Sequence, residues 1–144
     1  MNGIKIRIAE NRSELKKIFK IRETVFAKEQ KVPRNIESDK FDKTSKHVIV
    51  NYKGKPIGCA RVRFVNGNAK LERIAVLKSS RGKGIGKSIM NYLVNYCKDK
   101  RAKGVYMNAQ YYLKDYYSKL GFITKGKPFF EAKLKHIKMV FKGE

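Results

Sequence analysis

Acidic residues are scarce in this chain: its 144 residues include 12 aspartates and glutamates against 35 lysines and arginines, giving a formal net charge of +23. Cysteine occurs only at Cys59 and Cys97, which excludes a disulfide framework and gives no metal-ligand spacing. Apolar runs such as residues 48–50 are far too short to cross a membrane, and the amino terminus lacks the apolar core of a secretory signal. We therefore expect one domain over residues 1–144, in a reduced cytoplasmic setting, with no metal and no membrane partner.

The excess of positive charge leaves two interpretations of its partners open. A strongly basic surface attracts polyanions, which would suit a nucleic-acid-binding module. The lysines are spread along the whole chain, however, without a basic arm, a repeat or a recognition motif, and this dispersal is typical of a solvated surface. A nucleic-acid partner therefore stays an alternative.

Residues 71–88 predict a strand, a glycine-rich turn and the start of a helix. Apolar, β-prone residues fill the first part, and from Ile85 onward apolar residues recur three and four positions apart, which is helical periodicity. Gly82, Gly84 and Gly86 therefore lie where a strand leads into a helix amino terminus. Because glycine lets the backbone approach a ligand and the first-turn N–H groups favour an anion, the stretch predicts a phosphate-binding turn.

The spacing of these glycines excludes two common phosphate motifs. A P-loop would need a glycine at position 81, which is Arg81, and the third glycine of G-x-G-x-x-G would fall on Lys87 or Ile89. Residues 81–86, Arg-Gly-Lys-Gly-Ile-Gly, instead resemble the (Arg/Gln)-x-x-Gly-x-(Gly/Ala) motif of the GNAT superfamily of acetyl-CoA-dependent N-acetyltransferases. In that family the turn binds the pyrophosphate of coenzyme A. We call residues 81–87 the glycine turn.

Other segments resemble the ElaA-like branch of the same family. Residues 22–30 are similar to its R-x-x-V-F-x-x-E-Q segment, which is followed by acidic residues and a histidine, here His47. Residues 116–122 are similar to its (Phe/Tyr)-Tyr-x-x-x-Gly-Phe segment, and the tail repeats its pattern of a glutamate, a histidine and a methionine near the end. The resemblance covers nearly the whole chain.

The resemblance implies a mixed α/β (α+β) fold: a mostly antiparallel sheet with a central parallel, splayed strand pair, flanked by helices. The pattern along the chain points the same way, since residues 47–52, 57–65 and 70–76 predict three strands joined by tight turns. A helix then runs to about Lys103, and residues 105–110 must return parallel to the third strand through that helical crossover.

The activity implied is transfer of an acetyl group from acetyl-CoA to a primary amine, by direct attack in a ternary complex. Presenting a lysine-type amine in its neutral form at pH 7 costs roughly 4.6 kcal/mol, so some group must accept a proton. The resemblance makes Tyr117 the acid that protonates the leaving thiolate. Glu72 is the candidate base, because it occupies the strand position where many family members carry a glutamate.

The role of Glu72 is open on sequence grounds. Strand alternation places it on the face of Ile74 and Val76, and a carboxylate buried there would have the raised pKa that a base needs. Glu72 could equally pair with one of the many lysines. The rival bases are His47, Glu131 and His136.

The resemblance also implies a set of binding residues. Those for the cofactor are Ile74, Ala75, Val76, Arg81, Gly82, Lys83, Gly84, Ile85, Gly86, Lys87, Gln110 and Tyr117. Those for the acceptor are Glu29, Glu37, Asp39, His47, Glu131 and His136. A main-chain N–H near Ile74 or Val76 would polarise the thioester carbonyl.

Residues 34–46 hold three of the few carboxylates, Glu37, Asp39 and Asp42. They form either turns with local ion pairs or an acidic lip that receives a cationic amine, such as a polyamine, an aminoglycoside or a protein lysine. An acyl-CoA-binding protein without turnover is a second alternative to the enzyme. A monomer and a homodimer are both compatible with the sequence.

Overall fold

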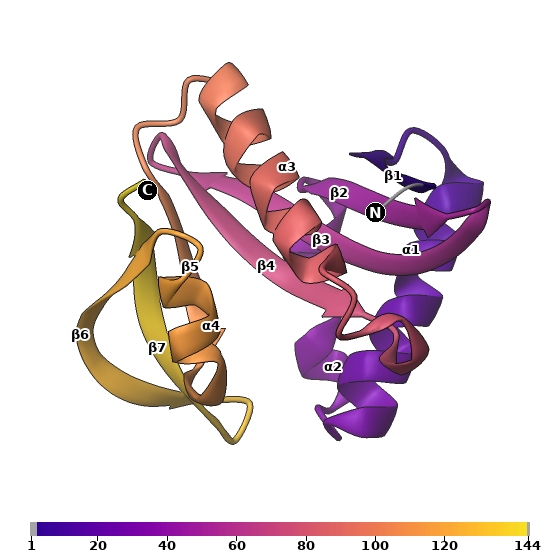
Figure 1. Cartoon of the computed structure of the whole chain (residues 1–144). Helices are drawn as coiled ribbons and strands as arrows, with labels where there is room; N and C mark the ends of the chain where they lie inside the picture. Colours follow the sequence, from indigo (N-terminus) through magenta and orange to yellow (C-terminus); the bar gives the residue numbers. More distant parts are fainter. Residues whose placement is uncertain (1–2, 144) are drawn as a thin grey trace.

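The computed structural model describes residues 3–143. Its strands form one seven-stranded sheet in the order β1-β2-β3-β4-β5-β7-β6, and every neighbouring pair is antiparallel except β4 and β5 (Figure 1). The mixed α/β fold and the antiparallel meander of β2, β3 and β4 are thereby confirmed. The strands are β1 (Ile4–Ile8), β2 (Lys46–Tyr52), β3 (Lys55–Val65), β4 (Asn68–Val76), β5 (Val105–Gln110), β6 (Phe122–Glu131) and β7 (Leu134–Phe141).

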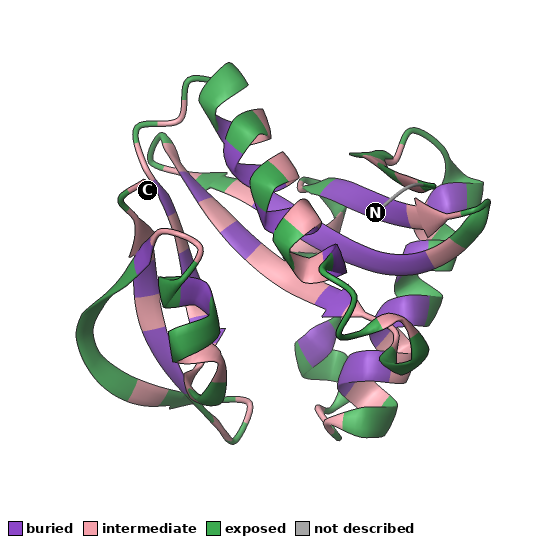
Figure 2. Cartoon of the chain, in the orientation of Figure 1, coloured by how far each residue is buried: buried purple, intermediate pink, exposed green. Residues whose placement is uncertain are grey.

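Two helical layers cover the faces of the sheet. The long helix α3 packs on one face, where its buried residues join those of β2, β3 and β5 in the main core. Helix α1 packs on the other face, against a smaller group of core residues. The helices are α1 (Arg12–Arg22), the π-helix η1 (Glu23–Glu29), α2 (Arg34–Glu37), the 3-10 turns η2 (Lys40–Lys43), η3 (Lys78–Ser80) and η4 (Tyr111–Leu113), α3 (Ile85–Asp99) and α4 (Lys114–Ser118). Figure 2 shows continuous buried stripes along β2, β3 and the inner side of α3.

Helix α1 begins at an asparagine cap. The Asn11 side chain accepts a hydrogen bond from the Glu14 main-chain N–H, which satisfies one of the free donors of the first turn. The helix then widens into η1, where the Gln30 N–H reaches the Val25 carbonyl five residues earlier. Such π-helical turns occur mostly at functional sites, and η1 does contribute to the pocket described below.

Helix α3 confirms the predicted periodicity but ends early. Ile85, Ile89 and Leu93 are buried on its inner face. The helix ends at Asp99 rather than at about Lys103, because Arg101 adopts a left-handed backbone with φ 58°, which a right-handed helix cannot include.

The parallel pairing of β4 and β5 is short. It joins residues 69–71 to residues 105–107, and beyond Leu71 and Met107 the two strands part. At the same point β4 contains a β-bulge, since Cys59 faces Ala75 while Arg61 faces Glu72. A bulge bends its strand and increases the local twist, so β4 turns away from β5 here. The splayed pair that the family resemblance implies is present.

No helix within residues 3–143 is long and apolar enough to span a membrane.

Candidate active site

A pocket of about 280 Å³ opens where β4 and β5 part. Residues 71–74 of β4 form one wall and residues 107–110 of β5 form the other. The rest of the lining includes Phe26 and Gln30 from the η1 segment, Glu37 and Asp39, Tyr117 of α4, and Glu131 and His136 from the β6–β7 hairpin. The pocket therefore collects residues from segments that lie far apart in the sequence, between the elements labelled β4 and β5 in Figure 1.

The glycine turn joins β4, the strand that forms one wall of the pocket, to α3, and its residues 81–84 are exposed. Gly82 and Gly84 have positive φ angles of 77° and 78°, a conformation that L side chains rarely adopt. A Cβ added to Gly86 would collide with the Tyr116 hydroxyl. Within residues 3–143 no acceptor lies within hydrogen-bond distance of the amides of residues 82–87. Free amides at a helix amino terminus fit the diphosphate of coenzyme A.

Arg81 does not point a free guanidinium at this turn. It pairs with both carboxylate oxygens of Glu29, each at 2.9 Å, and its Nε donates to the Val76 carbonyl at 2.8 Å. Glu29, expected at the acceptor, therefore ties the glycine turn to η1 and does not line the pocket. Of the other predicted cofactor residues, Ile74, Gln110 and Tyr117 line the pocket. Ala75 is buried in the core beneath α1, Ile85 is buried in the main core and Val76 packs against it. The remaining ones are the glycines and lysines of the turn itself.

Tyr117 lies at the pocket with its ring almost fully buried. The ring packs edge-on against Tyr116 and Phe122, and its hydroxyl makes no hydrogen bond to any other residue of the described chain. Burial, with smaller contributions from Tyr116 and Tyr112, raises the pKa of Tyr117 above its ordinary value. The hydroxyl therefore stays protonated at neutral pH, as a proton donor must.

The expected raised pKa of Glu72 is wrong. Burial alone would raise this pKa, but hydrogen bonds from Arg63 and Arg61 and the charges of Arg61 and Lys70 outweigh it, so the pKa of Glu72 falls to about 2. The carboxylate lies 2.8 Å from Arg61, 3.1 Å from Arg63 and 3.2 Å from Lys70. A carboxylate held by three cations accepts a proton only in strong acid. Glu72 is therefore an ion-pair partner and a poor proton acceptor at neutral pH.

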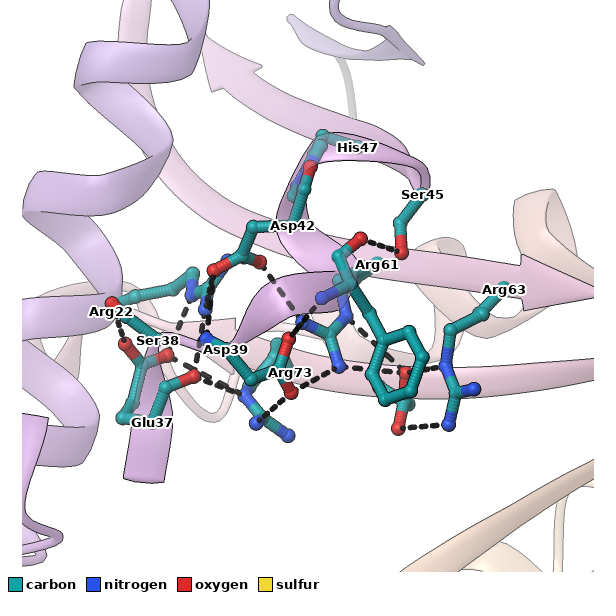
Figure 3. A network of polar contacts seen from close by, with 12 residues as sticks. Arg22, Glu37, Ser38, Asp39, Asp42, Ser45, His47, Arg61, Arg63 and Arg73 are labelled. Carbon is teal, nitrogen blue, oxygen red and sulfur yellow. Dashed lines mark hydrogen bonds and ion pairs between the residues drawn. The ribbon is translucent and has the colours of Figure 1, made fainter. Parts of the chain in front are cut away.

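The carboxylates of residues 34–46 form ion pairs with buried arginines (Figure 3). Arg22 contacts Glu37 and Asp42, while Arg61 contacts Asp39 at 2.7 Å and Asp42 at 2.9 Å. Both guanidinium groups are about 1% exposed. The alternative of local ion pairs is therefore confirmed. Glu37 and Asp39 also line the pocket, so an acidic lip that receives an amine stays a prediction for these two carboxylates.

Arg73 extends this network to the surface of the pocket. Its Nε donates to the Glu37 carbonyl at 2.9 Å, and its Nη2 donates to Asp39 at 3.1 Å. Arg73 also has a positive φ of 53° at the bulge of β4. This left-handed backbone conformation is unfavourable for a residue with a long side chain. Neither this residue nor Arg61 was expected at the site, although a charged residue inside the apolar run of β3 is a signal that could have identified Arg61.

His47 lies outside the pocket, contrary to its predicted place at the acceptor. It is buried, packs edge-on against Phe19, and its Nε2 donates to the Asp42 carbonyl at 2.8 Å. Burial lowers the pKa of this imidazole. These contacts indicate a structural role that holds the residue 40–46 segment against β2.

His136 and Glu131 line the pocket, as do Glu37 and Asp39 of the predicted acceptor residues. The Nδ1 of His136 lies 2.8 Å from the Leu134 carbonyl. A carbonyl can only accept, so Nδ1 carries the proton and Nε2 of the neutral ring is left as an acceptor. Nearby, the Gln110 side chain donates to Gln30 at 2.8 Å, joining β5 to the η1 segment.

Comparison with known proteins identifies the family of this chain. The family model of the acetyltransferase (GNAT) domain matches residues 9–142. The chain belongs to the GNAT acetyltransferase family. Acetyl-CoA is the cofactor of this family, as the glycine turn led us to expect.

Individual relatives agree with this assignment. The uncharacterized N-acetyltransferase YjcF of Bacillus subtilis is 41% identical over 138 residues, covering 95% of this chain and 99% of YjcF. The crystal structure of Escherichia coli ElaA superposes with a TM-score of 0.85 at 22% identity, covering 96% of this chain and 99% of ElaA. A GNAT acetyltransferase from Elizabethkingia anophelis, solved with acetyl-CoA bound, gives a TM-score of 0.72 at 17% identity, covering 97% of this chain and 96% of that one. The ElaA-like resemblance is confirmed.

The ion pairs of Glu72 predict a specific acid sensitivity. Because its pKa falls from 4.5 to about 2 in the folded state, its stabilisation is complete above pH 4.5 and is lost as the pH falls towards 2. The loss amounts to roughly 3 kcal/mol of unfolding free energy. This loss is measured by urea unfolding of the unmodified protein and of Glu72→Gln at a series of pH values from 7 to 2. The difference in unfolding free energy between the two proteins should become smaller as the pH falls.

The matched control is Glu23→Gln, which removes an exposed carboxylate paired with Arg34 and should change stability by less than about 1 kcal/mol. If the difference in unfolding free energy between the unmodified protein and Glu72→Gln stays constant down to pH 2, the ion-pair assignment is contradicted.

Proposed function

We propose that this protein is an acetyl-CoA-dependent N-acetyltransferase that acetylates a primary amine by direct attack. The observation that carries the proposal is the glycine turn, whose amides make no hydrogen bond within residues 3–143 and which follows β4, the strand whose residues 71–74 line the pocket. The two cysteines, both buried and unpaired, suit the reducing cytoplasm, where we place the enzyme.

The cofactor would bind along the glycine turn and enter the split of the sheet. The amides of residues 82–87 would hold the diphosphate, with the exposed side chains of Lys83 and Lys87 beside it. The β4 residues beyond Leu71 have no partner strand on the β5 side, which frees main-chain groups for the remainder of the cofactor. Bound acetyl-CoA supplies an activated acetyl thioester, and the amide of Ile74 is our candidate donor to its carbonyl oxygen.

Two side chains of the pocket suit the proton transfers. The Tyr117 hydroxyl, kept protonated by burial, would donate to the leaving sulfur. The free Nε2 of His136 would accept the proton that the amine loses, directly or through water. We assign this role to His136 rather than to Glu72, because Glu72 is held by three cations.

The function is tested by two measurements on the purified protein. Calorimetric titration with coenzyme A should show binding, and thiol release from acetyl-CoA should accelerate with an accepted amine. Coenzyme A binding without thiol release from any amine would support the acyl-CoA-binding alternative. Polynucleotide affinity that falls steeply with salt, in the absence of coenzyme A binding, would support the nucleic-acid alternative.

Gly84→Val should weaken coenzyme A binding by about tenfold or more, because a β-branched residue is strained at positive φ and would displace the amides of the turn. Titration calorimetry measures the change. Gly126→Val is the matched control: Gly126 has a similar φ of 83° and equally open space around its Cβ position, but it lies on β6. Equal weakening by both substitutions would show that the effect is general strain and not loss of a binding turn.

Tyr117→Phe should lower kcat roughly a hundredfold while coenzyme A affinity changes by less than about twofold, since only the donated proton is lost. Steady-state thiol release and calorimetry give the two values. Tyr112→Phe removes a hydroxyl from a ring that is 74% exposed and should leave both unchanged. An unaltered kcat in Tyr117→Phe removes this residue from the mechanism.

His136→Gln should lower kcat by about tenfold or more with coenzyme A binding retained, because the proton acceptor is lost. The informative control is His47→Gln, which deletes a buried imidazole outside the pocket and should reduce thermal stability without reducing kcat. The reverse result, with kcat lost in His47→Gln and kept in His136→Gln, would transfer the role to His47.

A further inference from the structure

Cations outnumber carboxylates in the ion-pair network beside the pocket. Within residues 3–143, each carboxylate of the network is shared by at least two cations. The network has five cationic and four anionic side chains, which leaves one excess positive charge. They are Arg22, Arg61, Arg63, Lys70 and Arg73, and Glu37, Asp39, Asp42 and Glu72.

Arg73 and Lys70 of this network remain 20% and 16% exposed and line the pocket, together with the carboxylates Glu37, Asp39 and Glu72 with which they pair. The Nε and Nη2 of Arg73 have acceptors in Glu37, Ile36 and Asp39, but its Nη1 has none in the part of the chain that the structure describes. In Figure 3 the Arg73 guanidinium lies at the margin of the network, beyond Asp39 and Glu37. The Nη1 group is therefore available to a ligand.

The charges around Arg73 favour an added anion. Burial of its guanidinium, together with the positive charges of Arg61 and Arg22, lowers the pKa of Arg73 in spite of Asp39 and Glu37. Repulsion by nearby cations is relieved when an anion binds among them. The positive φ of Arg73 at the β4 bulge adds a strained backbone, which is typical of residues held in place for a function.

The β6–β7 hairpin brings a different set of groups to the lining. Glu131 is exposed there and forms no ion pair with any residue from 3 to 143, and His136 presents its free Nε2. Both groups are acceptors, which suits an amine. The pocket thus has a part on β4 where the Nη1 of Arg73 lies among ion-paired carboxylates, and a part on the hairpin that can attract an amine.

We propose that the acceptor is an amine that also carries a carboxylate, with Arg73 and Lys70 binding the carboxylate and the β6–β7 hairpin receiving the amine. A guanidinium N–H group and a carboxylate form a charge-assisted hydrogen bond. Polyamines and other polycations are disfavoured, because the net charge of +23 repels them. This inference rests on the proposed function, since it names the substrate class of the same site.

The test compares acceptors that differ only in charge. Amino acids with one to five methylenes between the amine and the carboxylate, their carboxamides, and spermidine are assayed for thiol release. The best amino acid should have a kcat/KM about tenfold or more above that of its carboxamide, and spermidine should be poorer still. A carboxamide or spermidine that equals or exceeds every amino acid overturns the proposal.

Substitutions test which side chains give the preference for a carboxylate. Arg73→Gln should raise KM for the amino acid by about tenfold and leave the carboxamide unaffected, which removes the discrimination. Lys70→Gln, which leaves the strained bulge residue in place, should reduce the discrimination in the same direction. Arg34→Gln removes an equal charge from a side chain that is 72% exposed and should retain the discrimination, and thermal unfolding shows that each variant is folded.

A binding experiment separates this inference from the proposed function. The corresponding N-acetyl amino acids and their carboxamides are titrated into the coenzyme A-loaded protein and into its Arg73→Gln variant. Preference for the carboxylate, lost in Arg73→Gln, supports the inference even without turnover, and equal binding of both series overturns it. Absence of thiol release with every amine, despite coenzyme A binding, instead refutes the proposed function.

Discussion

The parting of β4 from β5 after three paired residues is the constraint on which the site depends. A parallel pair that continued to Gln110 would seal the sheet, and neither a pocket nor free main-chain groups on β4 would exist. The bulge of β4 at Arg73 turns the strand away, and packing of α3 against the sheet fixes the glycine turn at the end of the same strand. The glycine turn and one wall of the candidate pocket therefore both belong to β4 and the segment that follows it.

The buried arginines determine the shape of one wall of this pocket. Removing a guanidinium from water costs several kcal/mol, which attraction repays only when every donor has a partner. Arg22 and Arg61 have carboxylate partners at short distance, so residues 34–46, which form only the short helical segments α2 and η2 before β2 begins, are fixed to the sheet. Removal of any one partner would leave a buried charge, and the network therefore acts as a unit.

Local patterns predicted a large part of the fold. The glycine turn, the antiparallel meander and the parallel return of β5 follow from turn chemistry, periodicity and the handedness of crossovers. The early end of α3 was missed because the left-handed backbone of Arg101 leaves no compositional mark. The divergence of β4 and β5 came only from the family resemblance, since a bulge depends on how two strands pair.

The candidate site was harder to predict because burial and charge partners are tertiary properties. Strand alternation correctly brought Glu72 towards the interior, but its pKa depends on Arg61 and Arg63 of the neighbouring strand. The ion pairs of Asp39 could not be predicted for the same reason, because its partners Arg61 and Arg73 are 22 and 34 residues away in the sequence. Glu131 and His136, by contrast, reach the pocket as the family pattern implied.

The most direct measurement of the central claim is a crystal structure of the protein with coenzyme A. The account predicts the diphosphate within hydrogen-bond distance of the amides of residues 82–87 and the pantetheine arm in the gap between β4 and β5. A diphosphate bound elsewhere, or a gap between these strands that is closed in the complex, would contradict it.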